Sequence, residues 1–199
     1  GFVLIADSAL LPYVSKIRDL QGRLIGRMEG IGFELREEAV LETLTVDIVK
    51  TSEIEGEVLN HLEVRSSVAK RLGMEVSGLL NASRDVDGVV EMMLDATQHY
   101  LSPLSKDRLC GWYAALFPPG RSGMFKITVG DWRTDEQGPM QVVSGSIGKE
   151  RVHYTAPEAS RLDNEMSKFI KWFNTEESVE AVIKSGVAHL WFVSIHPFD

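Results

Sequence analysis

Residues 187–199 read VAHLWFVSIHPFD, an apolar, helix-compatible run that ends at a histidine followed by a proline. Proline lacks a backbone N–H and disfavours helical geometry in the residue before it, so the helix has to stop at His196. An imidazole at the end of a buried helix is held rigidly and can face a cleft. His196 is therefore the first candidate for a functional side chain.

Upstream of this stretch, the first hundred residues show apolar side chains at three- and four-residue steps, which is typical of amphipathic helices. One stripe runs from Leu10 to Met28, a second from Val40 to Ile54, and further stripes cover about 59–72 and 85–101. Gly56 interrupts the second stripe. Ser105 is placed to cap another helix that reaches residue 116.

The pattern changes between residues 121 and 155, where most of the β-type sequence lies. Phe125, Ile127 and Val129 alternate with polar neighbours, and short apolar runs follow at 140–143 and 152–154. We expect one or two hairpins standing out from a helical body. Residues 155–158 (TAPE) fit a capping box that opens the next helix. The whole pattern predicts a mainly α protein with an inserted β-hairpin rather than alternating βα units.

Composition narrows the functional classes. The chain of 199 residues can bury the core of one domain with a helical appendage, and its net charge of −8 argues against a general nucleic-acid surface. No apolar run reaches the roughly 20 residues of a membrane span. The single Cys110 excludes an internal disulfide and suits a reducing compartment. We expect a cytoplasmic protein that binds neither nucleic acid nor membrane.

Three motifs, in this order, resemble those of the Fic family (Fic/DOC fold). Thr51-x-x-x-Glu55-Gly56 matches the inhibitory pattern (S/T)xxxE(G/N), residues 152–157 with the helix after them look like the flap, and residues 195–199 match the start of HPFx(D/E)GNGRxxR. The resemblance covers roughly residues 35–199. It implies an N-terminal helical region at 1–80 with the inhibitory helix at about 40–56. A Fic core at 81–199 would follow, with the flap at about 121–155.

The resemblance also implies a reaction, which is transfer of AMP from ATP, with Mg²⁺, to a Tyr, Thr or Ser hydroxyl of a target protein. His196 would be the general base, because imidazole gains and loses a proton near neutral pH. Phe198 is expected to pack into the core and fix the loop beside the nucleotide, and Asp199 to touch the nucleotide. The remaining motif residues are absent from this sequence, so we interpret the chain as ending inside the loop and expect it to be inactive alone.

Regulation and target docking are further expectations from the resemblance. Glu55, with Thr51 and Gly56 of its motif, would occupy the space of the ATP γ-phosphate; the alternative is a solvated acidic stretch at a helix end. Residues Val152, His153 and Tyr154 would present a strand edge to the target. The other histidines lack ligand spacing, so we expect no metal site within the chain.

Two other readings of the sequence stay open. One is a helical regulatory module, similar to an antitoxin, whose Glu55 helix inhibits a partner. The other is a Fic relative that removes AMP or moves a phosphate or phosphocholine group. A homodimer is expected only from the family.

Overall fold

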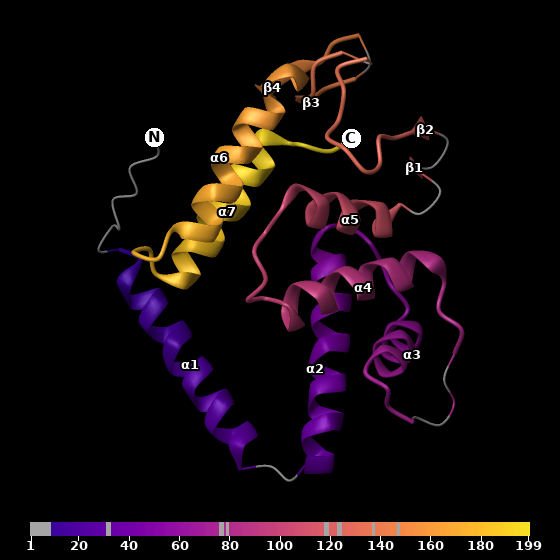
Figure 1. The fold of residues 1–199 in the computed structure, drawn as a ribbon, viewed down its shortest axis with the longest axis vertical. Helices are drawn as coiled ribbons and strands as arrows, with labels where there is room; N and C mark the ends of the chain where they lie inside the picture. The colour runs from indigo at the N-terminus through magenta and orange to yellow at the C-terminus, as the bar shows by residue number, and fades with distance from the viewer. Residues whose placement is uncertain are drawn as a thin grey trace.

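The computed structural model describes residues 9–30, 33–75, 78, 80–117, 120–122, 125–136, 138–146 and 148–199. Helices dominate these ranges, and the predicted mainly α class is confirmed (Figure 1). The helices are α1 (Leu11–Glu29), α2 (Phe33–Ile54), α3 (His61–Arg71), α4 (Arg84–Gln98), α5 (Lys106–Leu116), α6 (Leu162–Thr175) and α7 (Ala181–Ile195), with a 3-10 turn, η1 (Ala159–Arg161), before α6.

The first core lies where α2, α3 and α4 meet. Its buried side chains are almost all aliphatic: Leu41, Ile48, Val64, Val68, Ala69, Val86, Val90 and Leu94. Side-chain caps fix where two of these helices begin, since Asn60 accepts the Leu62 N–H at 2.9 Å and Ser83 accepts the Val86 N–H at 3.4 Å. Burial of each large aliphatic side chain contributes about 1.5–3 kcal/mol, so this core holds the N-terminal helices together.

The second core joins α5, α6 and α7 and is rich in aromatic rings. Its buried members are Leu104, Leu109, Cys110, Trp132, Leu162, Met166, Phe169, Ala188 and Ile195. Burial raises the pKa of the Cys110 thiol, as expected of a core residue. The Ser105 cap predicted for α5 is confirmed, because its hydroxyl accepts the Arg108 N–H at 3.1 Å. This core positions the end of α7.

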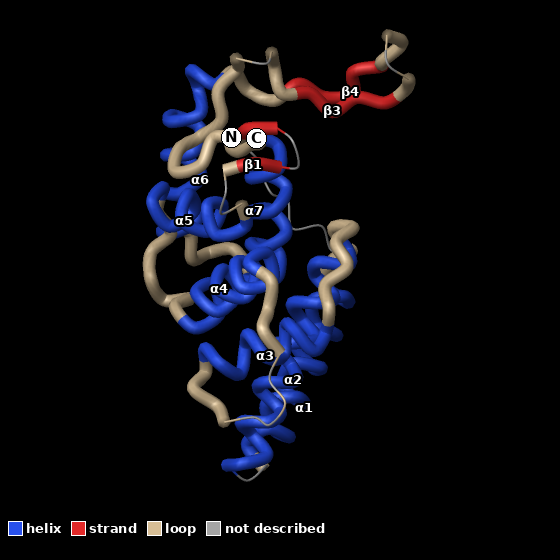
Figure 2. The backbone as a smooth tube through the Cα atoms, turned by 90° about the vertical axis from the view of Figure 1, so that its right-hand side faces the viewer, coloured by secondary structure: helices blue, strands red, loops and turns tan. Residues whose placement is uncertain are grey.

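Two antiparallel hairpins lie between α5 and α6. β1 (Arg121–Ser122) pairs with β2 (Phe125–Lys126), and β3 (Gln141–Ser144) pairs with β4 (Arg151–Thr155) with an irregularity between Val142 and Val143. Every residue of β3 and β4 is exposed. The β3–β4 hairpin projects from the helical body, as predicted for the flap (Figure 2).

Two local predictions from the sequence are wrong. The alternation at 125–129 suggested a strand through Val129, but β2 ends at Lys126. Ile127 is buried, and its N–H donates to the Gly120 carbonyl at 3.1 Å. The capping box at 155–158 does not form, because Thr155 is paired with Gln141 in the β3–β4 ladder.

Helix α1 forms where the apolar stripe predicts it, yet it buries none of its side chains. Leu11 is 63% exposed and Leu24 is 58% exposed. Figure 1 shows most of α1 apart from the other helices. Arg18 pairs with Glu180 before the start of α7, and Arg36 of α2 donates to the Met28 and Glu29 carbonyls at the end of α1. None of the described helices, α1 included, has the length and apolar character needed to cross a membrane.

Candidate active-site loop

His196 is the first residue after α7, and its backbone is left-handed. Its φ of 49° and ψ of 66° end the helix, and its N–H still donates to the Phe192 carbonyl at 2.9 Å. Among the described residues it is the only one other than glycine with a positive φ. A side chain in this region costs of order 1 kcal/mol or more, and it persists only where neighbours fix the backbone. No described residue hydrogen-bonds to the imidazole.

Arg133 is the neighbour that fixes this backbone. Its Nε donates to the His196 carbonyl at 2.7 Å, and its backbone N–H donates to the Pro197 carbonyl at 2.8 Å. The same guanidinium donates to Asp135 Oδ1 at 2.7 Å and to the Pro157 carbonyl at 2.5 Å. Arg133 is 3% exposed, so its charge is buried and paired with Asp135.

The residues after Pro197 are fixed from the other side by α5 and the segment after β2. The Phe198 ring stacks on Tyr113 at 4.3 Å between centroids and also packs near Trp132. The Tyr113 hydroxyl donates to the Asp199 carbonyl, and the Thr128 N–H donates to Asp199 Oδ2, both at 2.6 Å. Burial, and then the charge of Asp199, raise the pKa of the Tyr113 hydroxyl. Phe198 is thus partly buried and packs against the second core, as the sequence suggested.

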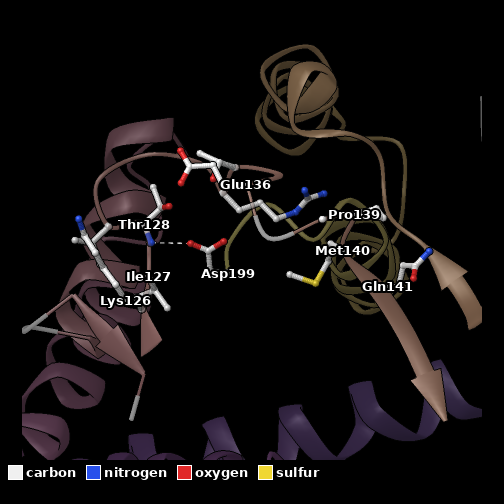
Figure 3. A pocket seen from close by; sticks show the side chains of 12 residues that line it. Lys126, Ile127, Thr128, Glu136, Pro139, Met140, Gln141 and Asp199 are labelled. Carbon is white, nitrogen blue, oxygen red and sulfur yellow. Dashed lines mark hydrogen bonds between the residues drawn. The ribbon is translucent and has the colours of Figure 1, made fainter. Parts of the chain in front are cut away.

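A cavity of about 830 Å³ opens beside Asp199 (Figure 3). Its wall runs from Lys126 to Val129, continues through Arg133, Thr134 and Glu136, and ends at the start of β3 with Met140 and Gln141. The wall mixes charged and apolar groups, so the cavity suits a polar ligand. His196 is not among its lining residues. The cavity therefore joins Asp199 to the base of the hairpin but not to the imidazole.

The expected docking residues lie on exposed β4. The Tyr154 hydroxyl donates to the Ser194 carbonyl at 2.6 Å and so ties the hairpin to the last turn of α7. His153 Nε2 lies 2.6 Å from the Ser144 hydroxyl across the ladder, and Val152 is 48% exposed. The hairpin is therefore hydrogen-bonded to α7 close to His196, because Ser194 is separated from His196 only by Ile195.

The expected inhibitory residues lie at the end of α2. Gly56, with φ of 90°, closes a Schellman motif in which its N–H donates to the Glu53 carbonyl and the Glu57 N–H donates to the Ser52 carbonyl. The turn that the sequence predicted at Gly56 is confirmed. Thr51 and Glu55 are exposed and line a second cavity of about 450 Å³, whose other walls come from α4 and the end of α5. Neither described cavity contains both Glu55 and His196.

Within the described ranges, no cluster of three or more His, Cys, Asp or Glu side chains is arranged to hold a metal ion. One carboxylate oxygen of Asp199 accepts the Thr128 N–H.

Sequence reasoning missed Arg133, Asp135 and Tyr113. Arg133 and Asp135 stand in a segment without periodicity, and apart from their own ion pair their partners are carbonyl and amide groups more than twenty residues away. The one signal was the tryptophan beside Arg133, since a large apolar residue in a glycine-rich loop favours burial of its surroundings. The role of the Tyr113 hydroxyl depends on the Asp199 carbonyl, which only the folded chain brings close.

Comparison with known proteins places this loop in a family. Residues 103–199 match the Fic/DOC family, and residues 5–74 match a domain of unknown function (DUF4172). A solved structure of a Fic family protein from Desulfovibrio desulfuricans G20 is similar over 98% of this chain, with 20% sequence identity and a TM-score of 0.56. No curated protein matches the chain.

Residues 103–199, the C-terminal part of the chain, are a Fic/DOC family domain. Proteins of this family are generally transferases, and AMP is a group that they commonly move. The likeness to the Desulfovibrio protein concerns the fold, and this chain spans about half, 53%, of that protein's length.

Proposed function

We propose that the protein of which this chain is part transfers AMP from ATP to a Tyr, Thr or Ser hydroxyl of a target protein, with His196 as general base. The observation that carries the proposal is the position of His196 within a Fic/DOC domain. Its backbone is left-handed and its carbonyl is held by a buried arginine. A strained backbone persists only where the surrounding structure holds it, so the left-handed conformation of His196 favours a functional role for its side chain.

The chemistry requires a proton acceptor beside the attacking oxygen. The target hydroxyl forms a bond to the α-phosphorus of ATP, its proton passes to a ring nitrogen of His196, and the bond to the pyrophosphate leaving group breaks. The products are an AMP phosphodiester on the target and pyrophosphate. A neutral imidazole suits this role near neutral pH.

The cavity beside Asp199 is the proposed entry for the polar parts of the substrates. Its hairpin wall is contiguous with the exposed strands that would pair with an extended target segment. Asp199 and Phe198 would form the floor beside the nucleotide. Mg²⁺ would enter with the ATP phosphates, which supply the oxygen ligands that this cation prefers.

Self-inhibition by Glu55 is the regulatory part of the proposal. Its carboxylate is exposed directly after α2, and the Schellman motif at Gly56 fixes the direction in which the chain leaves the helix. A carboxylate repels a triphosphate, so a Glu55 that points toward the γ-phosphate would exclude productive ATP. Thr51 lies one turn earlier on the same cavity wall.

The test is intact-mass measurement after incubation with ATP and Mg²⁺, using the protein at its natural length and, as candidate targets, itself and the proteins of a lysate. We expect an added AMP that rises when Glu55 is changed to Gly and disappears in the Glu55→Gly, His196→Ala double variant. Glu53→Gln is the matched control, because Glu53 lies on the same turn but outside the cavity lining.

Two results would count against this proposal. An adduct of a different mass, such as phosphate or phosphocholine, would keep the transferase class and replace AMP. No adduct in any variant, combined with capture of a partner by the α2 region, would favour the regulatory-module function.

A further inference from the structure

We propose that Arg133 is a positioning residue that fixes His196 at a constant place relative to the target-docking hairpin. The inference rests on the proposed function, because it treats His196 as the base and β3–β4 as the docking element. Its geometric part is independent of that function. Arg133 does not touch the reacting atoms; it acts through the backbone of His196.

The first argument is that Arg133 bonds three separate segments of the chain. Its guanidinium and backbone N–H hold the carbonyls of His196 and Pro197. The guanidinium also holds Asp135, which precedes β3, and Pro157, which follows β4. Both ends of the hairpin and the loop after α7 therefore meet at one planar group.

The second argument is the burial of that group. The Arg133 side chain is 1% exposed, and Asp135, at 2.7 Å, is its ion-pair partner among the described residues. Removing one partner of a buried pair leaves an uncompensated charge, so the arrangement resists partial opening. The second carboxylate oxygen of Asp135 accepts the Ala159 N–H at 2.6 Å, which extends the same network to the start of η1.

The third argument is the strain that the network supports. His196 has a left-handed backbone although it is not glycine, and the two carbonyls on either side of the His196–Pro197 turn both point to Arg133. The guanidinium also lies near the C-terminal end of α7, where the helix dipole favours positive charge. Arg133 thus supplies both the hydrogen bonds and the charge that this turn needs.

Lysine cannot replace this group. Three nitrogen atoms of the guanidinium point in fixed directions at three different oxygens, whereas an ammonium is a point charge on a flexible stem. We therefore expect Arg133→Lys to keep the charge and lose the geometry. A displacement of about 1 Å at a reacting group can cost on the order of 100-fold in rate.

The experiment compares Arg133→Lys with Arg108→Lys in the 199-residue chain. Arg108 is a matched control, because it also bonds one carboxylate, that of Asp95, and backbone carbonyls, here of Ser102 and His99. It does so between α4 and α5, away from His196. Thermal unfolding measures the Tm of each variant, so that their losses of stability can be compared. ¹³C,¹⁵N NMR reports the His196 Cα, Cβ and ring signals.

We expect Arg133→Lys to move the His196 Cα and Cβ chemical shifts away from the values of a left-handed backbone and to broaden the ring signals. Arg108→Lys should leave these signals unchanged, although it lowers Tm by a comparable amount. Unchanged His196 signals in Arg133→Lys would overturn the proposal and leave Arg133 a purely structural residue.

If Arg133→Lys does not fold, Asp135→Asn makes the same test. It removes one oxygen acceptor and the paired charge while leaving Arg133 in place, and unchanged His196 signals there would likewise overturn the proposal.

An activity measurement separates this inference from the proposed function. In the protein at its natural length, Arg133→Lys should lower kcat for AMP transfer by about 10- to 100-fold with the KM for ATP nearly unchanged, because only the alignment of the base is lost. Absence of transfer in the unchanged protein would refute the proposed function, and the NMR result would still decide the role of Arg133.

Discussion

At the scale of single residues, Asp95 shows how one carboxylate stabilises the contact between α4 and α5. It accepts from Arg108 Nε and Trp112 Nε1, both at 2.7 Å, and lies 2.9 Å from His99 Nδ1. The Arg108 hydrogen bond in the first place, and those of His99 and Trp112, outweigh the effect of burial and lower the pKa of Asp95 from 3.8 to about 2. Since the folded pKa is the lower one, the stabilisation is complete above pH ~4 and is lost as pH falls toward 2.

Asp95→Asn should therefore lower the free energy of unfolding at pH 7 by about 1 kcal/mol, a value discounted for solvent screening because the side chain is a third exposed. It should also flatten the fall in stability between about pH 4 and 2. Urea unfolding across this range measures both effects. Asp47→Asn on the exposed face of α2 is the control; equal pH profiles for the two variants would contradict the assignment.

Single residues also show which features of the fold the sequence could predict. Gly56 and His196 were predicted correctly as chain turns, because a glycine after an apolar stripe and a proline after a helix act on their immediate neighbours. Arg133 was not predicted, because its partners His196 and Pro157 are distant in the sequence and only the folded chain brings them to it. Whether His196 and Glu55 carry out the expected chemistry stays a prediction.

At the scale of elements, Gly88 sets the distance between α4 and α5. A Cβ there would lie 1.9 Å from the Ala115 carbonyl oxygen and 2.7 Å from its carbon. Both atoms belong to the backbone of α5, so the helices themselves would have to separate. We expect Gly88→Ala to lower the free energy of unfolding by about 2–3 kcal/mol, in the range of overpacked cores, as measured by urea denaturation.

The matched control for this contact is Gly111→Ala on α5. A Cβ at residue 111 meets no atom within 4 Å, and the position is exposed in a helix interior. Alanine is the better helix former there, so this variant should be more stable by about 0.5–1 kcal/mol. The same sign for both substitutions would show that helix propensity and not close approach governs Gly88.

Elements also differ in how well the sequence predicted them. The helices followed from apolar spacing that repeats over several turns, and all of them except α1 bury part of that stripe against a neighbour. The strands were harder to predict from the sequence, because β1 and β2 pair over two residues each and all of β3 and β4 is exposed. The start of η1 was mispredicted at Thr155, since Asp135 from the other side of the hairpin accepts the Ala159 N–H.

At the scale of the whole molecule, the packing of α4 on α5 joins the two cores. The aliphatic core of α2, α3 and α4 and the aromatic core of α5, α6 and α7 are separate clusters, and α4 packs on α5 between them. The sequence placed a boundary at residue 80, whereas α4 contributes Val86, Val90 and Leu94 to the first core. The two regions named by the family comparison, 5–74 and 103–199, leave α4 as the connection between them.

Helix α1 lies outside both cores, and its stability gives the last prediction. It buries no side chain, Leu20 is 54% exposed, and Arg18–Glu180 is an exposed pair. An isolated helix of this length is marginal in water, and an exposed ion pair adds about 0–1 kcal/mol. Its amides should therefore exchange with solvent by local opening, at least about 100-fold faster than those of α2 between residues 41 and 48.

Hydrogen exchange followed by mass spectrometry tests this expectation at two salt concentrations. Higher salt and Arg18→Ala should each speed exchange at the start of α1 by no more than a few-fold, because both remove the same screened ion pair. Arg23→Ala, whose partner Asp19 lies on α1 itself, is the control and should leave the link to α7 intact. Protection of α1 equal to that of α2 would contradict the prediction, because burial of its apolar stripe is the one term large enough to hold the helix closed.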